Sequence, residues 1–179
     1  GGAPAVMAKP GEGQEVDAAW MSGVLNCEVE SCDVKAAAEG QTGVTFLVRN
    51  IVYASNPNGL ATSFAIKMHA LSPEGRQCAV ASKFYDKELY FYNEFKDALD
   101  GLDFAIPKVH AMYKDTTVMS NVFGDTNGTS YFNLVMEDLN VEYEAYSTIP
   151  GKTPPLADIE ASMQLFKSMH IKFFKWNDP

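Results

Sequence analysis

The fold is decided by residues 44–70, which read VTFLVRNIVYASNPNGLATSFAIKMHA. Two parts of this stretch, Val44–Tyr53 and Thr62–Ala70, have the composition of β-strands. Asn56-Pro57-Asn58-Gly59 lies between them and consists of residue types that favour turns. The sequence therefore predicts two neighbouring strands joined as a hairpin.

Further strands and two helices are expected around this hairpin. The other strands are expected at Val34–Ala38, Lys108–Tyr113 and Tyr131–Glu137, the last two separated by a polar loop at 120–130. The helices are expected at Cys78–Leu99, ended by Asp100-Gly101, and from Leu156 to about Lys175, after a proline-containing loop at 149–155. The order β-β-β-α-β-β-loop-α predicts an α+β fold with an antiparallel five-stranded sheet and one long packed helix.

Composition and charge exclude several classes of protein. Of 179 residues, 46% are hydrophobic and 21% are charged, which is typical of a globular domain. The net charge of −9 argues against binding of nucleic-acid phosphates, and no apolar run reaches the roughly 18 residues of a membrane span. The three cysteines, Cys27, Cys32 and Cys78, show no CxxC spacing. They favour a reducing compartment, cytoplasmic or organelle-soluble, over secretion.

The N-terminal stretch differs in composition from the rest. Residues 1–16 are rich in Gly, Ala and Pro, which predicts a flexible arm. The chain starts at Gly1-Gly2 instead of Met and has no charged segment followed by an apolar one. Two explanations stay open, a removed leader and a fragment of a longer chain.

One acidic residue lies inside an aromatic stripe of the expected helix. Phe84, Glu88, Phe91 and Phe95 follow one another at spacings of four, three and four residues, which places them on one helix face. An ionised carboxylate in such a setting is costly unless a cation or several donors meet it.

The strand at residues 64–68 offers that cation. Alternation puts Phe64, Ile66 and Met68 on one face and Ala65 and Lys67 on the other. Lys67 thus lies within the strand, among core-forming neighbours. We expect Lys67 to pair with Glu88. The alternative is that Lys67 extends to solvent and Glu88 lies at the margin of the stripe.

These residues resemble segments of the aminoglycoside phosphotransferase and choline- and ecdysteroid-kinase-like superfamily, which has a protein-kinase-like fold. Five segments occur in the family's order: Phe64-Ala65-Ile66-Lys67, Lys87-Glu88-Leu89-Tyr90-Phe91-Tyr92, Ile106-Pro107-Lys108-Val109, Leu134-Val135-Met136-Glu137-Asp138-Leu139, and the helix from Leu165 through Met169-His170 to Trp176. The resemblance covers residues 35–176. It implies that residues 17–148 are an ATP-binding N-terminal lobe, followed at 149–179 by a linker and the first helix of a C-terminal lobe.

The resemblance also implies roles for individual residues. Lys67 would contact the α- and β-phosphates of ATP, and Glu88 would hold its ammonium group in place. Ala65 would lie against the adenine, and the backbone of Glu137 and Leu139 would hydrogen-bond the adenine edge.

A glycine-bearing turn, Gly40-Gln41-Thr42-Gly43, precedes the strand at Val44–Tyr53. By the resemblance its backbone N–H groups would cover the phosphates. It has two glycines where protein kinases have three, and an ordinary hairpin turn is the alternative.

ATP and Mg²⁺ are the cofactors that the resemblance implies. The family's catalytic loop is a His-Gly-Asp motif with an Asn five residues after the Asp, and no Asp of this chain has such an Asn. The catalytic residues and the Mg²⁺ ligands of the family are therefore absent from this sequence. Asp103-Phe104-Ala105 is similar to a Mg²⁺-binding motif, but it precedes the hinge segment and is expected to be a loop.

Other polar residues are expected to be structural. His170 lies on a stripe of apolar residues in the last helix and is expected to be a packed core histidine. His69 and His110 have no partner at metal-ligand spacing. A solvated surface is expected for the acidic residues Glu137, Asp138, Glu142 and Glu144.

Two functions remain open from the sequence. The first is the nucleotide-binding lobe of an ATP-dependent small-molecule phosphotransferase that lacks its catalytic loop within this chain, and so would be inactive alone. The second is a non-catalytic, kinase-like scaffold or assembly subunit. Both require a partner, a missing C-terminal lobe or another protein, to cover the last helix.

Overall fold

The computed structural model describes residues 16–56, 58–99, 106–115, 131–141 and 153–174. The chain divides into two compact units, one made of Gly1–Leu89 with Pro107–Asp138 and the other of Tyr90–Ile106 with Leu139–Pro179. The loop at 120–130, Asp103-Phe104-Ala105 and residues 1–15 of the expected arm lie outside the described residues. The predicted end of the arm at residue 16 is wrong, because Val16 is buried in the hydrophobic core.

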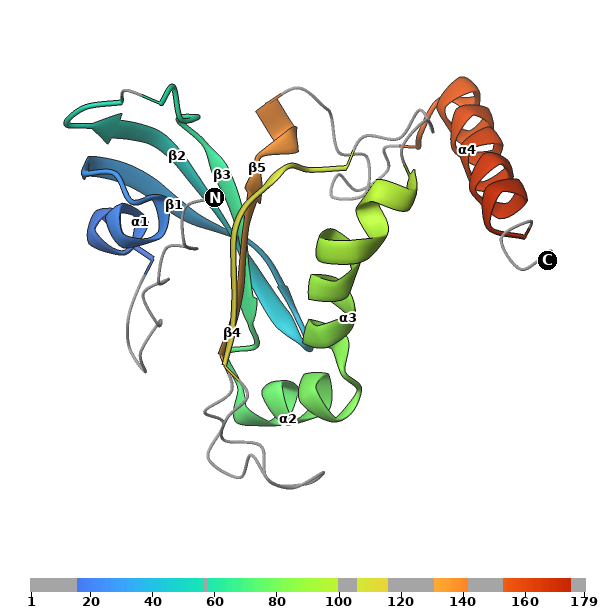
Figure 1. Ribbon diagram of the computed structural model, residues 1–179, viewed down its shortest axis with the longest axis horizontal. Coiled ribbons are helices and arrows are strands. Elements are labelled where there is room, and N and C mark those ends of the chain that lie inside the picture. The colour runs from blue at the N-terminus through green and yellow to red at the C-terminus, as the bar shows by residue number, and fades with distance from the viewer. Residues whose placement is uncertain (1–15, 57, 100–105, 116–130, 142–152, 175–179) are drawn as a thin grey trace. The chain divides into compact units, whose positions relative to one another are not determined.

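An antiparallel five-stranded sheet forms the first unit (Figure 1). Its strands are β1 Val29–Gly40, β2 Gly43–Tyr53, β3 Phe64–His69, β4 Val109–Asp115 and β5 Tyr131–Glu137, in the spatial order β1-β2-β3-β5-β4. The predicted α+β class and five-stranded antiparallel sheet are confirmed. β5 has the predicted bounds, whereas β1 extends well beyond the predicted Val34–Ala38 at both ends.

The predicted turn between β2 and β3 is also present. The N–H of Gly59 donates to the carbonyl of Asn56 at 3.2 Å, and Gly59 has a φ of 61°, where glycine has no steric penalty. Asn56 also accepts the N–H of Leu60 through its side chain, at 2.7 Å.

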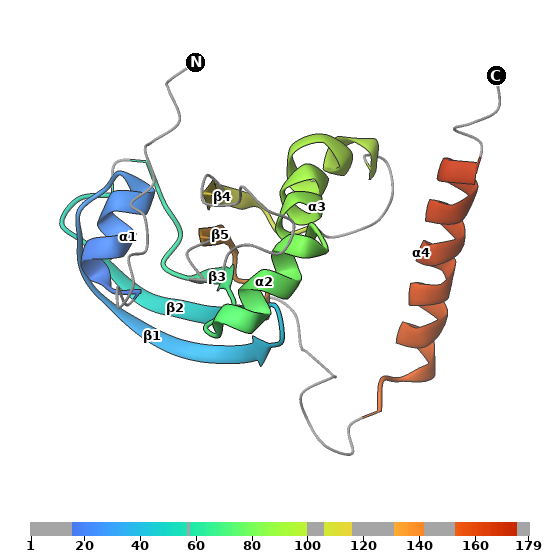
Figure 2. The ribbon, with the colours of Figure 1, turned by 90° about the horizontal axis from the view of Figure 1, so that it is seen from below.

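Helices flank the sheet on both sides (Figures 1 and 2). Helix α1, Ala18–Leu25, begins at the N-cap Asp17, whose carboxylate accepts the N–H of Trp20 at 2.7 Å, and ends at Asn26 in the left-handed conformation. It was not predicted, because eight residues give too few turns for a hydrophobic period to stand out. Helix α3, Phe84–Tyr90, lies on the other side of the sheet.

The register of the strands therefore defines two faces. The α1 face carries Val44, Val48, Phe64, Ile66, Met68 and Val135, and the α3 face carries Thr45, Leu47, Ala65, Lys67, Leu134 and Met136. These six side chains of the α1 face are buried, and Trp20, Met21 and Val24 of α1 join them in one hydrophobic core, against which the half-buried Phe46 of the same face packs. On the α3 face, only Leu134 of the six is buried.

The predicted single helix at Cys78–Leu99 is wrong. Helix α2 spans Pro73–Ala81 and starts earlier, at the N-cap Ser72, whose hydroxyl accepts the N–H of Gly75. It ends before Lys83, which has a φ of 56° and separates α2 from α3. After α3 the chain continues as a π-helical turn and a 3₁₀ turn, which are Phe91–Phe95 and Lys96–Leu99.

The second unit contains those two turns and helix α4, Leu156–Phe174. α4 agrees with its predicted bounds, and its Phe173 stacks on Phe95 with ring centroids 4.9 Å apart. The predicted aromatic stripe does not form as one helix face, because the π-helical turn changes the angle between successive residues. His170 is exposed, so its prediction as a core histidine is wrong.

Candidate functional site

The predicted ion pair between β3 and α3 is confirmed. Lys67 Nζ lies 2.8 Å from Glu88 Oε1, and the side chains are 38% and 23% exposed. Strand alternation directs Lys67 to the α3 face, and Glu88 lies on the turn of α3 that packs there. The amine is therefore directed by a carboxylate and is still accessible to solvent.

Tyr85 links α3 to the sheet beside this pair. It lies three residues before Glu88, on the same side of the helix, and its ring stacks on Phe132 at 4.6 Å with an angle of 5° between the planes. Its hydroxyl accepts the N–H of Ala70 at 3.2 Å and donates to the carbonyl of Thr42 at 2.8 Å. Burial raises the pKa of Tyr85, which keeps this donor protonated.

Gly40-Gln41-Thr42-Gly43 forms the tight turn between β1 and β2, with Gly40 and Gly43 paired across it. A Cβ on Gly43 would lie 2.8 Å from the carbonyl oxygen of Met68 and 3.9 Å from Cε of Lys67. The turn thus runs alongside the stem of Lys67. Since Tyr85 binds the Thr42 carbonyl, the turn is also fixed to α3.

α2 holds the other side of this turn. A Cβ on Gly75 would lie 2.3 Å from the carbonyl oxygen of Gln41, a contact that no other residue type could make without moving the backbone. The turn joins the paired strands β1 and β2 and is fixed between two helices.

Next to Lys67 the α3 face carries a row of apolar side chains. Leu47 of β2, Ala65 of β3 and Met136 of β5 are aligned by the strand register, and all three are half-buried. Val109 of β4 pairs with Met136 and continues the row. We call Leu47, Ala65 and Met136 the apolar row.

Glu137 and Leu139, whose backbone is predicted to hydrogen-bond the adenine edge, lie in different units. Glu137 is the last residue of β5, and its N–H donates to the carbonyl of Lys108 at 2.8 Å, so a ligand could use only its carbonyl. Leu139 starts a 3₁₀ turn, Leu139–Val141, in the second unit.

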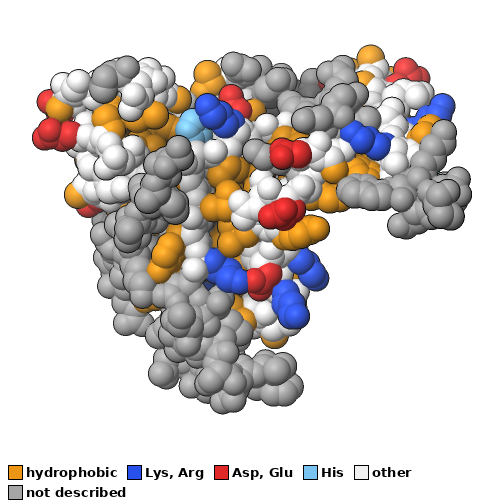
Figure 3. Space-filling view, viewed as in Figure 1, with side chains coloured by type: hydrophobic (Ala, Val, Ile, Leu, Met, Phe, Trp, Pro, Cys, Tyr) orange, Lys and Arg blue, Asp and Glu red, His pale blue; other side chains and the backbone are white. Residues whose placement is uncertain are grey.

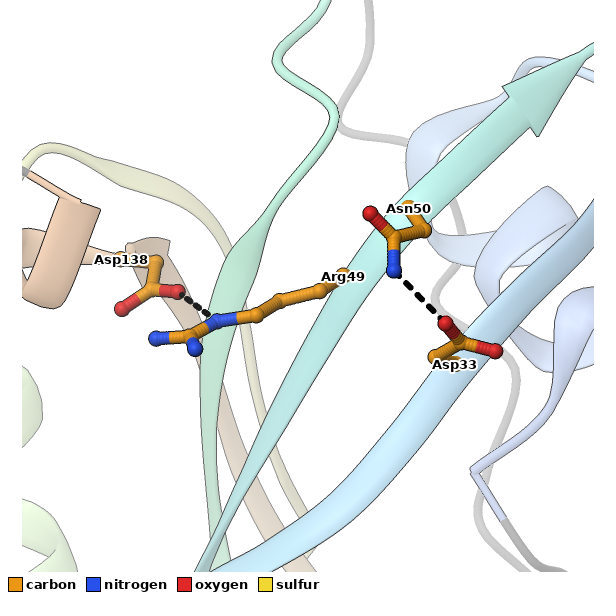
Figure 4. Close-up of polar contacts among 4 residues, drawn as sticks. All are labelled: Asp33, Arg49, Asn50 and Asp138. Carbon is orange, nitrogen blue, oxygen red and sulfur yellow. Dashed lines mark hydrogen bonds and ion pairs between the residues drawn. The ribbon is translucent and has the colours of Figure 1, made fainter.

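A second ion pair, between Arg49 and Asp138, lies on the other side of the apolar row in the strand register. Arg49 Nε lies 2.8 Å from Asp138 Oδ2, and Figure 4 shows the Arg49 side chain crossing β3 to reach it. The Asp138 side chain is 0% exposed, so the prediction that this residue lies on a solvated surface is wrong. The hydrogen bond to Asp138 and the charge of its carboxylate raise the pKa of Arg49.

The backbone next to Arg49 is irregular. Asn50 has a φ of 52°, and the pairing of β1 with β2 shifts there. The Asn50 amide donates to Asp33 at 2.7 Å, which holds the irregular residue against β1 (Figure 4).

Lys114 of β4 forms a further ion pair with Asp86 of α3. The Lys114 side chain is 22% exposed and the Asp86 side chain 50%. This pair joins a strand to α3 as Lys67 and Glu88 do, but it lies on the edge strand, away from the apolar row.

None of the described histidines belongs to a metal centre. His69 is buried, and desolvation, followed by the charge of Arg76, lowers its pKa to about 4, so it is neutral at physiological pH. His110 packs edge-on against Phe64. Within the described residues no group of three His, Cys, Asp or Glu side chains could hold a metal ion.

Three contributors to this region were not apparent from the sequence: Arg49, Tyr85 and Asp138. Arg49 shares the strand alternation of Leu47, and Tyr85 is three residues from Glu88, so both could have been assigned to the α3 face from periodicity. Asp138 gave no such signal, because acidic residues after a strand are usually solvated.

Comparisons with protein-family models, with curated proteins and with solved structures found no match. None of the helices among the described residues has the length and apolar character needed to cross a bilayer. On the face seen in Figure 3, basic and acidic side chains are interspersed, without a large patch of one sign.

Proposed function

We propose that the first unit is the nucleotide-binding lobe of an ATP-dependent small-molecule phosphotransferase, as the resemblance in sequence implies. The observation that carries this proposal is the Lys67–Glu88 ion pair, accessible to solvent, beside the apolar row. A nucleotide needs such a combination, because its phosphates require a cation and its base requires a flat, partly dehydrated surface.

The chemistry of the two parts is complementary. The Lys67 ammonium is a compact point charge that can bind phosphate oxygens, and Glu88 restricts where it points. Ala65, between Leu47 and Met136, leaves room for a ring because its side chain is a single methyl group. The nucleotide would therefore place its phosphates at Lys67 and its base on the apolar row.

The described residues fit ATP better than they fit Mg²⁺. No cluster of three candidate ligands occurs among them, and the sequence lacks the family's catalytic loop. When bound to a nucleotide, Mg²⁺ neutralises phosphate charge, but this chain offers no described site that would hold it. The proposal is therefore nucleotide binding by this chain, without phosphoryl transfer.

The test is a titration of the full chain with a fluorescent ATP analogue and with ATP by calorimetry. We expect Lys67→Met to raise the Kd at least about tenfold, since a charge-assisted contact to phosphate is lost. Lys114→Met is the matched control, because it removes the other ion pair between the sheet and α3 and should leave the Kd within about twofold. No binding by the unmodified chain, or equal Kd values for it and Lys67→Met, would contradict the proposal.

The scaffold function is supported by a different observation, the exposed apolar side chains of α4. They are Leu156, Ile159, Met163, Phe166 and Ile171, between 42% and 69% exposed. A helix with these side chains in water favours a covering partner. The titration separates the two functions, since a scaffold without nucleotide chemistry would bind no ATP.

A further inference from the structure

Two ion pairs on the α3 face bracket the apolar row. Lys67 lies one register step to one side of Ala65, in line with Thr45 and Leu134. Val48 and Glu137 both pair with Phe64, and Arg49 and Asp138 are the next residues along the chain. Arg49 and Asp138 therefore lie on the side of Ala65 opposite Lys67. Along β2, Arg49 is four residues from Thr45, a separation of about 13 Å.

The Arg49–Asp138 pair spans the sheet at the start of β3. Because β3 lies between β2 and β5, the arginine crosses roughly 10 Å, two strand spacings, to reach the carboxylate (Figure 4). Asp138 is fully buried, and the Arg49 cation stabilises its charge there. The irregular backbone at Asn50, fixed to Asp33, adds a second constraint on the neighbouring Arg49.

The guanidinium group of Arg49 is only partly used. Asp138 is bonded by Nε, and within the described part of the chain neither Nη group of Arg49 has a hydrogen-bond or ion-pair partner. The Arg49 side chain is 43% exposed. Both Nη groups are therefore fixed donors that solvent, or a ligand, can reach.

We propose that Arg49 is a second ligand contact of the site, which donates from Nη to acceptor atoms of the ring system on the apolar row. This inference rests on the proposed nucleotide binding. It divides the work between two cations: Lys67 binds the phosphates, and Arg49 binds the base end. Asp138 acts through Arg49, by holding its guanidinium in place.

Because the two cations would bind different ends of the nucleotide, their effects are separable with ligands that carry one end only. Inorganic tripolyphosphate has the phosphates without the ring, and adenosine has the ring without the phosphates. Loss of Arg49 Nη donors should weaken ATP and adenosine but not tripolyphosphate. Loss of the Lys67 amine should weaken ATP and tripolyphosphate but not adenosine.

The experiment measures the affinity of the full chain for ATP, adenosine and tripolyphosphate, with Arg49→Lys as the main variant. A lysine keeps a positive charge for Asp138 and removes the planar pair of Nη donors. We expect Kd values about tenfold higher for ATP and adenosine, and a Kd for tripolyphosphate within about twofold of the unmodified chain. Lys67→Met, with the opposite pattern, is the positive control.

A second variant guards against a purely structural effect. Arg49→Met combined with Asp138→Leu removes the buried carboxylate together with its cation, and replacing such a pair by apolar residues often costs no stability. We expect this variant to fold, as judged by its thermal midpoint, and to show the same selective loss of ATP and adenosine.

The outcomes distinguish the two proposals. If the unmodified chain binds ATP and Arg49→Lys binds adenosine equally well, the role of Arg49 is wrong and nucleotide binding stands. If Arg49→Lys weakens tripolyphosphate instead, Arg49 is a phosphate contact and the inference is again wrong. If the unmodified chain binds none of the three ligands, the proposed function itself fails.

Discussion

The two faces of the sheet are built from alternate residues of the same strands, yet they differ in what covers them. On the α1 face, most side chains that the register places there are apolar and buried, from Val44 to Val135, although Phe46 is half-buried and Asn133 is a buried polar residue. On the α3 face, Leu134 is buried, but the apolar row and Lys67 remain partly accessible. One face thus supplies stability, and the other keeps surface that a ligand can use.

The largest expected effect tests this division directly. Ile66 is 0% exposed on the α1 face, and Ile66→Ala should lower the free energy of unfolding by about 2–5 kcal/mol, because it leaves a cavity. Leu47→Ala, one register step away on the α3 face, should cost only about 1 kcal/mol, because Leu47 is half-buried. Urea unfolding of both variants measures the difference, and equal losses would mean that the two faces are equally packed.

The second effect concerns Asp138, a carboxylate that the α3 face buries. Arg49→Met leaves the Asp138 carboxylate buried without this cation and should lower the free energy of unfolding by about 3–5 kcal/mol at neutral pH. Adding Asp138→Leu should recover most of the loss. A single variant as stable as the unmodified chain would show that Arg49 contributes little to the burial of Asp138.

The third effect is a pH dependence from His69, at the end of β3. Its pKa of about 4 in the folded chain lies below its ordinary value of 6.5, so the unfolded chain binds more protons between these pH values. Stability should therefore be complete above pH 6.5 and should fall as the pH drops to 4, by about 3 kcal/mol in total.

Urea unfolding at a series of pH values measures this slope. His69→Gln, which cannot titrate, should lack this part of the pH dependence while keeping the part that comes from carboxylates. If the unmodified chain and His69→Gln change in parallel between pH 6.5 and 4, His69 is not held neutral in the folded chain.

Much of the sheet and half of the site follow from local patterns. Alternation in residues 64–68 correctly placed Lys67 opposite the large apolar side chains, and the predicted pairing with Glu88 is confirmed although the helix and the aromatic stripe from which it was inferred are not. Both inferences depend on neighbours within a few residues, where the period of a strand or a helix determines direction. The same rule fails at Lys83. This non-glycine residue adopts the left-handed conformation and interrupts the helix predicted at Cys78–Leu99.

The remaining parts of the site depend on contacts between distant segments. Arg49 and Asp138 are 89 residues apart in sequence, and only the order of the strands brings them together. The hydrogen bond from Tyr85 to Thr42 likewise joins residues separated by 43 positions. No local pattern encodes such pairs, so the placement of an ion pair on each side of the apolar row became apparent only from the structure.

The smallest expected effect on stability belongs to the residue with the largest expected effect on binding. Lys67→Met breaks an ion pair whose two side chains are both partly exposed, and such pairs contribute about 1 kcal/mol or less. The free energy of unfolding should therefore change little in urea titrations, and the change should shrink further at high salt, which screens exposed charges. A stability loss as large as that of Ile66→Ala would mean that Lys67 and Glu88 hold the fold together, as a structural ion pair does. If Lys67→Met instead loses little stability but binds ATP much more weakly than the unmodified chain, the amine serves ligand binding, because stability alone would not require a charge at this position.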